Sequence, residues 1–475
     1  MADPKGFMKV ARKEAGYRPT KERIYDFGEV EQTLDVEDRL LQASRCMDCG
    51  VPFCHWGCPV GSKIPEWQDA VYRGNKEEAY YILHSTNNFP EITGRICPAP
   101  CEKSCVLAIH EEAVTIRENE CATVEQAFDA GIIKANPPQN RTGKKVAVIG
   151  SGPAGLAAAD LLNRAGHSVT VFEKNDAVGG LLRYGIPDFK LNKRVIERRI
   201  DIFKEEGIEF KTGVTVGADI SKEELLAGFD AVVLAIGAEQ PRNLEIEGRD
   251  LEGVHFALDF LIQQNKVVSG QEIPEEERIF VKDKNVLVIG GGDTGSDCVG
   301  TSVRQKANSI TQIEILPKPP EKRAENNPWP YWPQILRTSS SHKEGCERRW
   351  SISTKRFIGE NGKLKQAELV QVEWNKNENG QWVMNEVPGT NEIVDVDFVF
   401  LSMGFTQPVH TGLLDTLGVE FDQRGNIKVD DRKQTSVAKI FAAGDAEKGA
   451  SLVVHAIRAG NVAAKNVDEF LRNNK

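Results

Sequence analysis

Residues 145–173 read KVAVIGSGPAGLAAADLLNRAGHSVTVFE, and this stretch predicts the architecture of much of the chain. A β-branched run leads into GSGPAG, and a helix of small residues and a second β-branched run follow, ending at Glu173. This order is typical of a dinucleotide-binding βαβ unit. In such a unit Gly150 makes the tight turn, Gly152 lets the backbone approach a pyrophosphate, and Gly155 lets helix and strand pack closely. Glu173 lies about 20 residues after the first glycine, where a carboxylate binds a ribose hydroxyl.

The same order returns in NVLVIGGGDTGSDCVGTSVRQ, residues 285–305, and predicts a second dinucleotide site. Its next β-branched run, ITQIEIL (310–316), ends without an acid, and Lys318 and Arg323 follow. Positive charge where NAD-binding proteins carry a carboxylate favours the 2′-phosphate of NADPH. Arg304, at the end of the glycine helix, is a further candidate for binding that phosphate. The expected contacts also include Gly290, Gly291, Gly292, Asp293, Thr294 and Gly295.

The bulk composition limits the classes of partner. The chain has 475 residues, enough for two or three domains. Lys and Arg total 60 against 70 Asp and Glu, a balance of -10, which argues against nucleic acid because such binding rests on clustered positive charge. No apolar run approaches the roughly 18 residues that span a bilayer, and the first residues contain no signal-peptide core. The sequence therefore predicts a cytoplasmic protein that binds neither nucleic acid nor membrane.

Three regions of the chain differ in pattern. Residues 1–140 are rich in cysteine and aromatic residues, have helical stretches at 37–45 and 67–85, and lack a sustained strand, so we expect a helical domain. NPPQNRTGKK (136–145) is typical of a linker. Beyond it, short β-branched runs alternate with helices, which predicts an α/β fold with parallel sheets. These runs are VAVIG, VTVFEK, AVVLAIG, NVLVIG and IFAAGD.

Two further loops, AVGGLLRYGIP (177–187) and IFAAGDAEKGASLVVHAIRAGN (440–461), point to a flavin. They resemble the flavin-contacting loops of reductases with two dinucleotide domains, such as disulfide reductases and adrenodoxin reductase. The resemblance implies a glutathione-reductase-like fold, in which residues 141–280 and 398–475 form one FAD domain and residues 281–397 form an inserted NADPH domain. The expected FAD contacts are Gly150, Gly152, Pro153, Ala154, Gly155, Glu173, Lys174, Gly180, Leu181, Arg183, Val214, Gly444, Asp445, Ser451 and Leu452.

Eight of the ten cysteines lie between residues 46 and 121, which points to metal binding. RCMDCGVPFCHWGCPVG (45–61) has the spacing C-x2-C-x4-C-x3-C-P, similar to a ferredoxin run with a longer middle gap, and GRICPAPCEKSC (94–105) adds three cysteines. Seven thiolates in this order suggest two interleaved 4Fe-4S clusters, because the fourth cysteine of a ferredoxin run binds the other cluster. Zinc is the structural alternative. We expect His55 to pack or to form a hydrogen bond instead of binding metal.

The sequence also indicates how electrons would leave a flavin. GGLLRYGIPDFK (179–190) contains no cysteine, and Cys298 has no partner at C-x-x-C spacing, so we expect Cys298 to be a small buried residue and no dithiol to accept electrons. A flavin can release electrons singly to a nearby one-electron acceptor. The cysteine-rich domain would supply that acceptor.

The motifs above, with LPKPPEKRAENNPWPYWP (316–333) and SLVVHAIRAGN (451–461), resemble the NADPH-dependent glutamate synthase small subunit along essentially the whole chain. The amino-terminal half of dihydropyrimidine dehydrogenase has the same plan. By that resemblance Glu120 would stand in place of an oxygen-donating glutamine, whereas thiolate preference alone points to Cys121. The 97 to 101 spacing is shorter than in that enzyme, and Lys306 replaces a more usual glycine. The implied ligands are Cys46, Cys49, Cys54 and Cys105 for one cluster, and Cys58, Cys97, Cys101 and Glu120 for the other.

The resemblance implies a division of labour between two chains. This chain would take hydride from NADPH onto FAD and pass electrons through its clusters to a large subunit that makes glutamate from glutamine and 2-oxoglutarate. Hydride transfer needs proximity more than acid–base groups, so no catalytic residue is predicted. The alternatives are an NADPH:ferredoxin oxidoreductase subunit and a zinc-binding interaction protein with inactive nucleotide folds.

Overall fold

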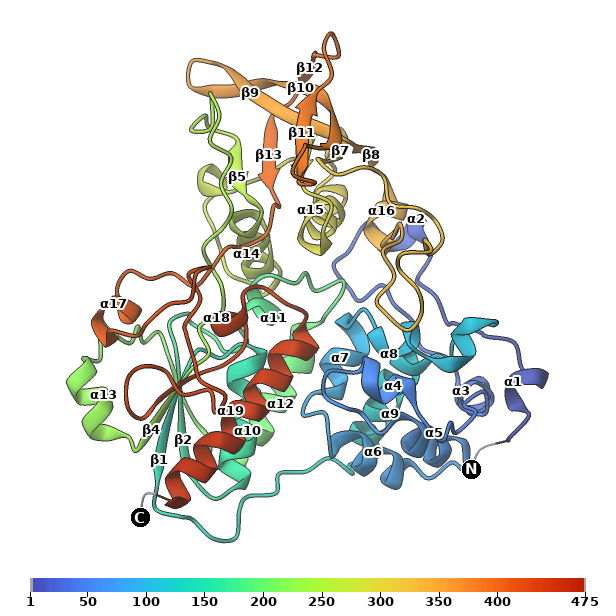
Figure 1. Ribbon diagram of the computed structural model, residues 1–475, viewed down its shortest axis with the longest axis vertical. Coiled ribbons are helices and arrows are strands. Elements are labelled where there is room, and N and C mark those ends of the chain that lie inside the picture. The colour runs from blue at the N-terminus through green and yellow to red at the C-terminus, as the bar shows by residue number, and fades with distance from the viewer. Residues whose placement is uncertain (1–2, 474–475) are drawn as a thin grey trace.

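The computed structural model describes residues 3–473 and confirms an α/β architecture preceded by a helical domain (Figure 1). The helical domain, in blue, lies beside α10 (Pro153–Arg164) and α19 (Val453–Asn473) of the first dinucleotide domain. The second dinucleotide domain lies above these two helices in the view of Figure 1. None of the helices within residues 3–473 combines the length and the apolar character needed to cross a membrane.

Short helices joined by turns form the N-terminal domain, and from residue 3 to the linker the structure has no sustained strand, as predicted. The stretch 67–85 is two helices instead of one, because Gly74 leaves the helical conformation at φ +71° and Asn75 caps the second helix by accepting from the Glu78 N–H. The elements are α1 (Gly6–Lys9), α2 (Thr20–Arg23), α3 (Val36–Ala43), α4 (Phe53–Gly57), α5 (Ile64–Tyr72), α6 (Lys76–His84), α7 (Pro90–Ile96), α8 (Pro100–Lys103), η1 (Val106–Ile109) and α9 (Ile116–Asp129).

The first parallel sheet has the strand order β14-β4-β1-β2-β3 and contains the first glycine motif. Its central strands are buried except for the exposed first residue of β1, Lys145, as expected for a sheet that helices cover on both faces. Its strands are β1 (Lys145–Ile149), β2 (Ser168–Glu173), β3 (Glu209–Thr212), β4 (Ala231–Leu234) and β14 (Ile440–Ala442). Besides α10 and α19, its helices are α11 (Leu181–Tyr184), α12 (Lys193–Glu205), α13 (Lys222–Gly228), α17 (Leu413–Leu417) and α18 (Asp445–Lys448).

The second parallel sheet has the order β5-β13-β6-β7-β8. It extends beyond the range 281–397 expected for the inserted domain, because β5 and β13 both pair within it. The expected limits at 280 and 398 are therefore too narrow. Its strands and helices are β5 (Val254–Phe256), α14 (Ala257–Val268), η2 (Glu275–Glu277), β6 (Asn285–Ile289), α15 (Asp293–Arg304), β7 (Ser309–Glu314), α16 (Ser340–Glu344), β8 (Glu347–Trp350) and β13 (Phe398–Leu401).

A small antiparallel sheet, which was not expected from the sequence, lies against the second dinucleotide domain (Figure 1). Its long strand β10 pairs with each of the other three strands. The strands are β9 (Ile352–Glu360), β10 (Lys363–Lys376), β11 (Trp382–Glu386) and β12 (Glu392–Asp395).

The helical domain and the first dinucleotide domain share one hydrophobic core. Phe89 and Ile92 of α7 belong to the same cluster of buried residues as Phe203 of α12. Beside them Arg199 donates to both carboxylate oxygens of Glu91, at 2.6 and 3.1 Å, and both side chains are buried. Breaking a buried pair of this kind is strongly destabilising, so the two domains are held in a fixed arrangement.

Candidate functional site

The first glycine loop opens into a cavity of about 490 Å³, which we call the flavin cavity. Pockets for drug-sized ligands measure roughly 300–1,000 Å³, so this cavity has the size of a ligand site. Eleven of the predicted FAD contacts line it. They are Gly150, Gly152, Pro153, Ala154, Glu173, Lys174, Gly180, Leu181, Val214, Asp445 and Ser451.

Four predicted contacts do not line the flavin cavity. Gly155 stands behind the loop, where a Cβ would collide with the Gly150 carbonyl, so its role is the close packing of helix on strand. Gly444 packs in the same way against Ala154. Arg183 donates from Nε to the Val178 carbonyl at 2.7 Å, and Leu452 packs against the hydrophobic core, so their contact with FAD stays a prediction.

Glu173 holds the glycine loop in place. Its side chain is 4% exposed and accepts from the backbone N–H groups of Ser151 at 3.1 Å and of Asn175 at 2.9 Å. The carboxylate at the end of β2 is thus fixed directly beside the turn after β1, the position predicted for a ribose ligand.

Three segments of the flavin cavity were missed in the sequence. Residues 236–239 follow β4, residues 215–218 follow β3, and residues 409–413 reach the cavity from the loop after β13. The glycine that ends AVVLAIG, Gly237 at φ +72°, was a usable signal for the first segment. The third segment carries no local motif, because only the return of the chain from the second domain brings it there.

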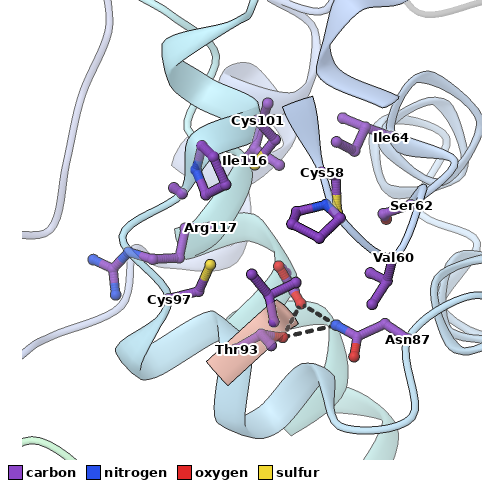
Figure 2. A pocket seen from close by; sticks show the side chains of 15 residues that line it. Cys58, Val60, Ser62, Ile64, Asn87, Thr93, Cys97, Cys101, Ile116 and Arg117 are labelled. Carbon is purple, nitrogen blue, oxygen red and sulfur yellow. Dashed lines mark hydrogen bonds between the residues drawn. The ribbon is translucent and has the colours of Figure 1, made fainter. Parts of the chain in front are cut away.

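Four of the predicted cluster ligands, three cysteines and Glu120, line one small pocket, which we call the Glu120 pocket. Figure 2 shows Cys58, Cys97 and Cys101 arranged around it. Burial raises the pKa of Cys97 to about 12 and that of Cys58 to about 11. Buried thiols of this kind become ligands when a metal replaces their protons.

Glu120 presents one carboxylate oxygen to this pocket. Its Oε1 accepts from Asn87 Nδ2 at 2.8 Å and from the Thr93 hydroxyl, both drawn as dashed lines in Figure 2. These donors fix the side chain and leave Oε2 as the available donor atom. Burial raises the pKa of Glu120 to about 7.

Cys121, the alternative eighth ligand, does not line the Glu120 pocket. It lies against Gly94 at the contact of α7 with α9, where a Cβ on Gly94 would be 2.7 Å from the Cys121 backbone nitrogen and Cα. The geometry therefore places the carboxylate, and not this thiol, beside the other three ligands.

Gly94→Ala should destabilise the helical domain by about 1–3 kcal/mol, because α7 and α9 would have to separate to admit the methyl group. This outweighs the roughly 0.5–1 kcal/mol that alanine gains over glycine inside a helix. Thermal unfolding of the holo chain measures the loss. Gly228→Ala is the control, since a Cβ at Gly228 meets no atom within 4 Å, and it should leave Tm unchanged or slightly higher. Equal Tm values for the two variants would contradict the close contact.

The other four predicted thiols line a second small pocket, the Cys46 pocket. Burial raises the pKa of Cys46 to about 12. His55 does not line this pocket; its Nε2 accepts from the Ile64 N–H at 3.0 Å, which confirms the expected hydrogen-bonding role. The four thiols are Cys46, Cys49, Cys54 and Cys105.

Each pocket gathers four potential ligands, and within residues 3–473 no three His, Cys, Asp or Glu side chains converge closely enough to hold a single metal ion. Thiolates are the usual ligands of iron–sulfur clusters. The donor set of seven thiols and one carboxylate therefore fits iron–sulfur chemistry.

The three cavities are adjacent. Val453, at the start of α19, lines the flavin cavity, and the next residue, Val454, lines the Glu120 pocket. Ile64 and Ile116 line both the Glu120 pocket and the Cys46 pocket. No cysteine within residues 3–473 lines the flavin cavity, and Cys298 is fully buried, as predicted.

A loop of the second dinucleotide domain contacts two residues that line the Cys46 pocket. Trp329 packs at a tilt of 47° against Phe53, with ring centroids 4.6 Å apart, and its Nε1 donates to the Cys105 carbonyl at 3.2 Å. Arg323, predicted to bind the 2′-phosphate, donates to the carbonyls of Tyr331 at 2.7 Å and Lys103 at 3.1 Å. In this structure Arg323 therefore fastens the loop to the helical domain.

The second glycine loop repeats the geometry of the first. A Cβ at Gly295 would collide with the Gly290 carbonyl, as at Gly155, whereas a Cβ at Gly292 would meet no atom within 4 Å, as at Gly152. Gly292 precedes Asp293, the first residue of α15, so the helix N-terminus faces the open side of the loop.

Arg304 is not available to a nucleotide, which corrects its assignment. Its side chain is 7% exposed, and its guanidinium donates to the Glu344 carboxylate at 2.6 Å and to the Asp26 carbonyl at 2.9 Å. Because Arg23 also pairs with Glu344, the group ties the N-terminal segment to α16.

The expectation that no acid ends the strand after the second glycine motif is wrong. β7 ends at Glu314, and Ile315 and Leu316 lie outside the ladder. The carboxylate of Glu314 lies against Gly291, since a Cβ on that glycine would collide with it. Lys318 lies nearby, with Nζ 5.4 Å from the centre of the Trp350 ring, and Trp350 is the strand partner of Glu314.

Comparison with known proteins agrees with this arrangement. A family model described as "Pyridine nucleotide-disulphide oxidoreductase" matches residues 144–460, and one described as "Dihydroprymidine dehydrogenase domain II, 4Fe-4S cluster" matches residues 23–132. The structure of Mycobacterium tuberculosis FprA in complex with NADPH has a TM-score of 0.56 at 19% identity, covering 70% of this chain and 85% of that one. At that identity the likeness shows the fold alone.

Sequence relatives extend over the whole chain. The glutamate synthase (NADPH) small chain of M. tuberculosis is 50% identical over 478 residues, which cover 99% of this chain and 96% of the relative. The glutamate synthase (NADH) of Schizosaccharomyces pombe is 46% identical over 476 residues, which cover 98% of this chain and 22% of the relative. This chain belongs to the family of glutamate synthase small chains, within the pyridine nucleotide oxidoreductases.

Proposed function

We propose that this chain is the electron-input chain of a glutamate synthase. It oxidises a reduced nicotinamide dinucleotide and passes the electrons through FAD and two 4Fe-4S clusters to a large chain, which makes glutamate from glutamine and 2-oxoglutarate. The observation that carries the proposal is the row of adjacent cavities, from the flavin cavity through the Glu120 pocket to the Cys46 pocket. Electron transfer between cofactors requires such proximity, and no dithiol offers another exit.

The chain's own residues have separate tasks. Gly150 and Gly152 admit a pyrophosphate at the N-terminus of α10, and Glu173 accepts from a ribose hydroxyl. FAD supplies hydride acceptance and the release of single electrons when it is bound. The thiols and Glu120 hold the iron, and hydride transfer itself needs positioning more than a general acid.

NADPH is the donor named for the M. tuberculosis and Escherichia coli relatives, the latter 38% identical over 475 residues. Lys318, at the carboxyl edge of the second sheet, supports NADPH here through attraction to a 2′-phosphate. The S. pombe relative is named for NADH.

A large partner chain is part of the proposal. The bacterial relatives are named small chains, and the S. pombe relative carries a matching segment within a much longer chain. We place the assembly in the cytoplasm, where reducing conditions suit ten unpaired cysteines. Ferredoxin reduction is the rival activity, and zinc binding is the less favoured one because the family model that matches residues 23–132 is described with a 4Fe-4S cluster.

Anaerobic purification followed by NADPH titration tests the proposal. We expect one FAD, and roughly eight iron and eight sulfide per chain from two cubane clusters. NADPH should bleach the flavin, and the large chain should co-purify and restore glutamate formation. Colourless protein containing zinc, or flavin that stays oxidised with every reduced nicotinamide, would contradict it. Rapid ferredoxin reduction without any large chain would favour the rival activity.

A further inference from the structure

We propose that Glu314 determines nucleotide specificity at the second glycine loop, by accepting a hydrogen bond from the 2′-hydroxyl of the adenosine ribose, and that NADH is therefore a hydride donor of this chain. The inference rests on the proposed oxidation of a reduced nicotinamide. It goes beyond it by identifying the residue that distinguishes the two dinucleotides.

The strand register makes Glu314 the counterpart of Glu173. In the first sheet the last residue of β1, Ile149, pairs with Phe172, and Gly150 and Glu173 come next. In the second sheet Ile289 pairs with Ile313, and Gly290 and Glu314 come next. Each acid therefore stands at the same step of its ladder beside its own glycine turn.

The position of the carboxylate agrees with the register. Glu173 accepts from the N–H of Ser151, the residue after Gly150. Glu314 lies against Gly291, the residue after Gly290, and leaves no room there for a side chain. Both carboxylates thus lie over the first peptide of their glycine loop, where the adenosine ribose of a bound dinucleotide is held.

Glu314 also retains capacity for a ligand. It is half-buried, and burial raises its pKa while Arg348 opposes that rise. The Trp350 side chain hydrogen-bonds to it, and an ionised carboxylate has roughly four acceptor positions. A 2′-hydroxyl would donate to one of the remaining positions, whereas a 2′-phosphate would bring negative charge against negative charge.

Two cations beside Glu314 explain how NADPH can still bind. Lys318 Nζ lies 5.4 Å, and the Arg348 guanidinium 4.9 Å, from the centre of the Trp350 ring. They supply attraction for a 2′-phosphate at the same edge of the sheet. The balance between Glu314 and these cations sets the preference between NADH and NADPH. Removing the Glu314 charge should therefore shift the preference toward NADPH, and removing a cation should shift it toward NADH.

The test compares kcat/KM for NADH and NADPH in anaerobic flavin reduction by the holo chain. The parent should use NADH at least as well as NADPH. Glu314→Gln keeps the packing against Gly291 and removes the charge, so the ratio of NADH to NADPH efficiency should fall about 10-fold or more. Glu314→Asp keeps the charge and should retain the NADH preference. Lys318→Ala should raise the ratio.

Glu347→Gln is the matched control, because Glu347 is an exposed carboxylate on β8 of the same sheet and should leave the ratio unchanged. A parent whose flavin NADPH reduces but NADH does not would overturn the inference and leave the proposed function standing. Equal losses for both nucleotides in Glu314→Gln would also overturn it. Flavin that neither nucleotide reduces would instead refute the proposed function, and the inference with it.

Discussion

Gly152→Ala should fold normally and bind FAD at least 10-fold more weakly than the parent. Gly152 has φ −67° and ψ 179°, an extended conformation that alanine also adopts, and its Cβ would meet no protein atom within 4 Å. The new methyl group would instead point into the flavin cavity, at the point where the backbone must approach the pyrophosphate. The substitution should therefore weaken FAD binding without destabilising the fold.

Two variants and a direct measurement make this prediction specific. FAD content and Kd from flavin fluorescence report binding, while circular dichroism and iron content report the fold and the clusters. Gly228→Ala, also in open space but away from the cavity, should keep full FAD. Gly155→Ala should instead destabilise the whole domain, because its Cβ would collide with the Gly150 carbonyl. Full FAD affinity in Gly152→Ala would show that the pyrophosphate does not pass this loop.

The glycine loops could be predicted because their requirements are local. A turn between strand and helix, a close approach to phosphate and a helix packed on a strand each need a residue without a Cβ at a fixed spacing. The strands β1, β2, β4, β6 and β14 coincide with the predicted runs. The predicted division of the cysteines between two clusters came from family resemblance, since spacing alone does not indicate that Cys105 lies in the same group as Cys46.

The failures arise where distant parts of the chain meet. The apolar run ITQIEIL gives no sign that the ladder ends at Glu314, because Ile315 and Leu316 look like strand residues but are 42% and 50% exposed. Arg304 was expected to bind a phosphate because the sequence around it does not reveal its buried partner Glu344, which lies on another element. β5 and β13 join the second sheet from outside its expected range for the same reason.

The antiparallel sheet was missed because its strands do not alternate with helices. β10 carries an alternating pattern of buried and exposed residues, typical of a strand with one solvated face. Buried β-branched runs, which identified the other strands, are instead typical of parallel sheets. Since this sheet contributes no lining residue to the flavin cavity or either cysteine pocket, the error left the candidate site unchanged.

Cys101→Ala should lose one cluster and keep the other. Iron should fall from roughly eight to roughly four per chain, because the Glu120 pocket loses a ligand while the Cys46 pocket keeps all four. FAD should stay bound and reducible by nicotinamide, and electron delivery to the large chain should fall to background. Iron and sulfide analysis, electron paramagnetic resonance of the reduced protein, and a glutamate synthesis assay measure these effects.

Cys121→Ala is the matched control. Cys121 and Cys101 are each 7% exposed, so both substitutions remove a similarly buried sulfur, but Cys101 lines the Glu120 pocket and Cys121 lines neither cysteine pocket. The control should keep its full iron content. Loss of iron in Cys121→Ala with retention in Cys101→Ala would contradict the ligand set, and loss of FAD in Cys101→Ala would indicate general unfolding instead of loss of one ligand.

Substitutions at Glu120 test whether its carboxylate binds the cluster or only lies near it. Thr93 and Asn87 both donate to Oε1, so the single oxygen of Glu120→Gln would stay with these donors and its NH2 group, which cannot bind iron, would face the pocket. Glu120→Gln therefore keeps the size and packing of the side chain but removes the oxygen ligand, and we expect it to lose roughly four iron per chain. Glu120→Ala should also lose roughly four iron, as Cys101→Ala does. Full iron content in Glu120→Ala would mean that three thiols hold this cluster without the carboxylate.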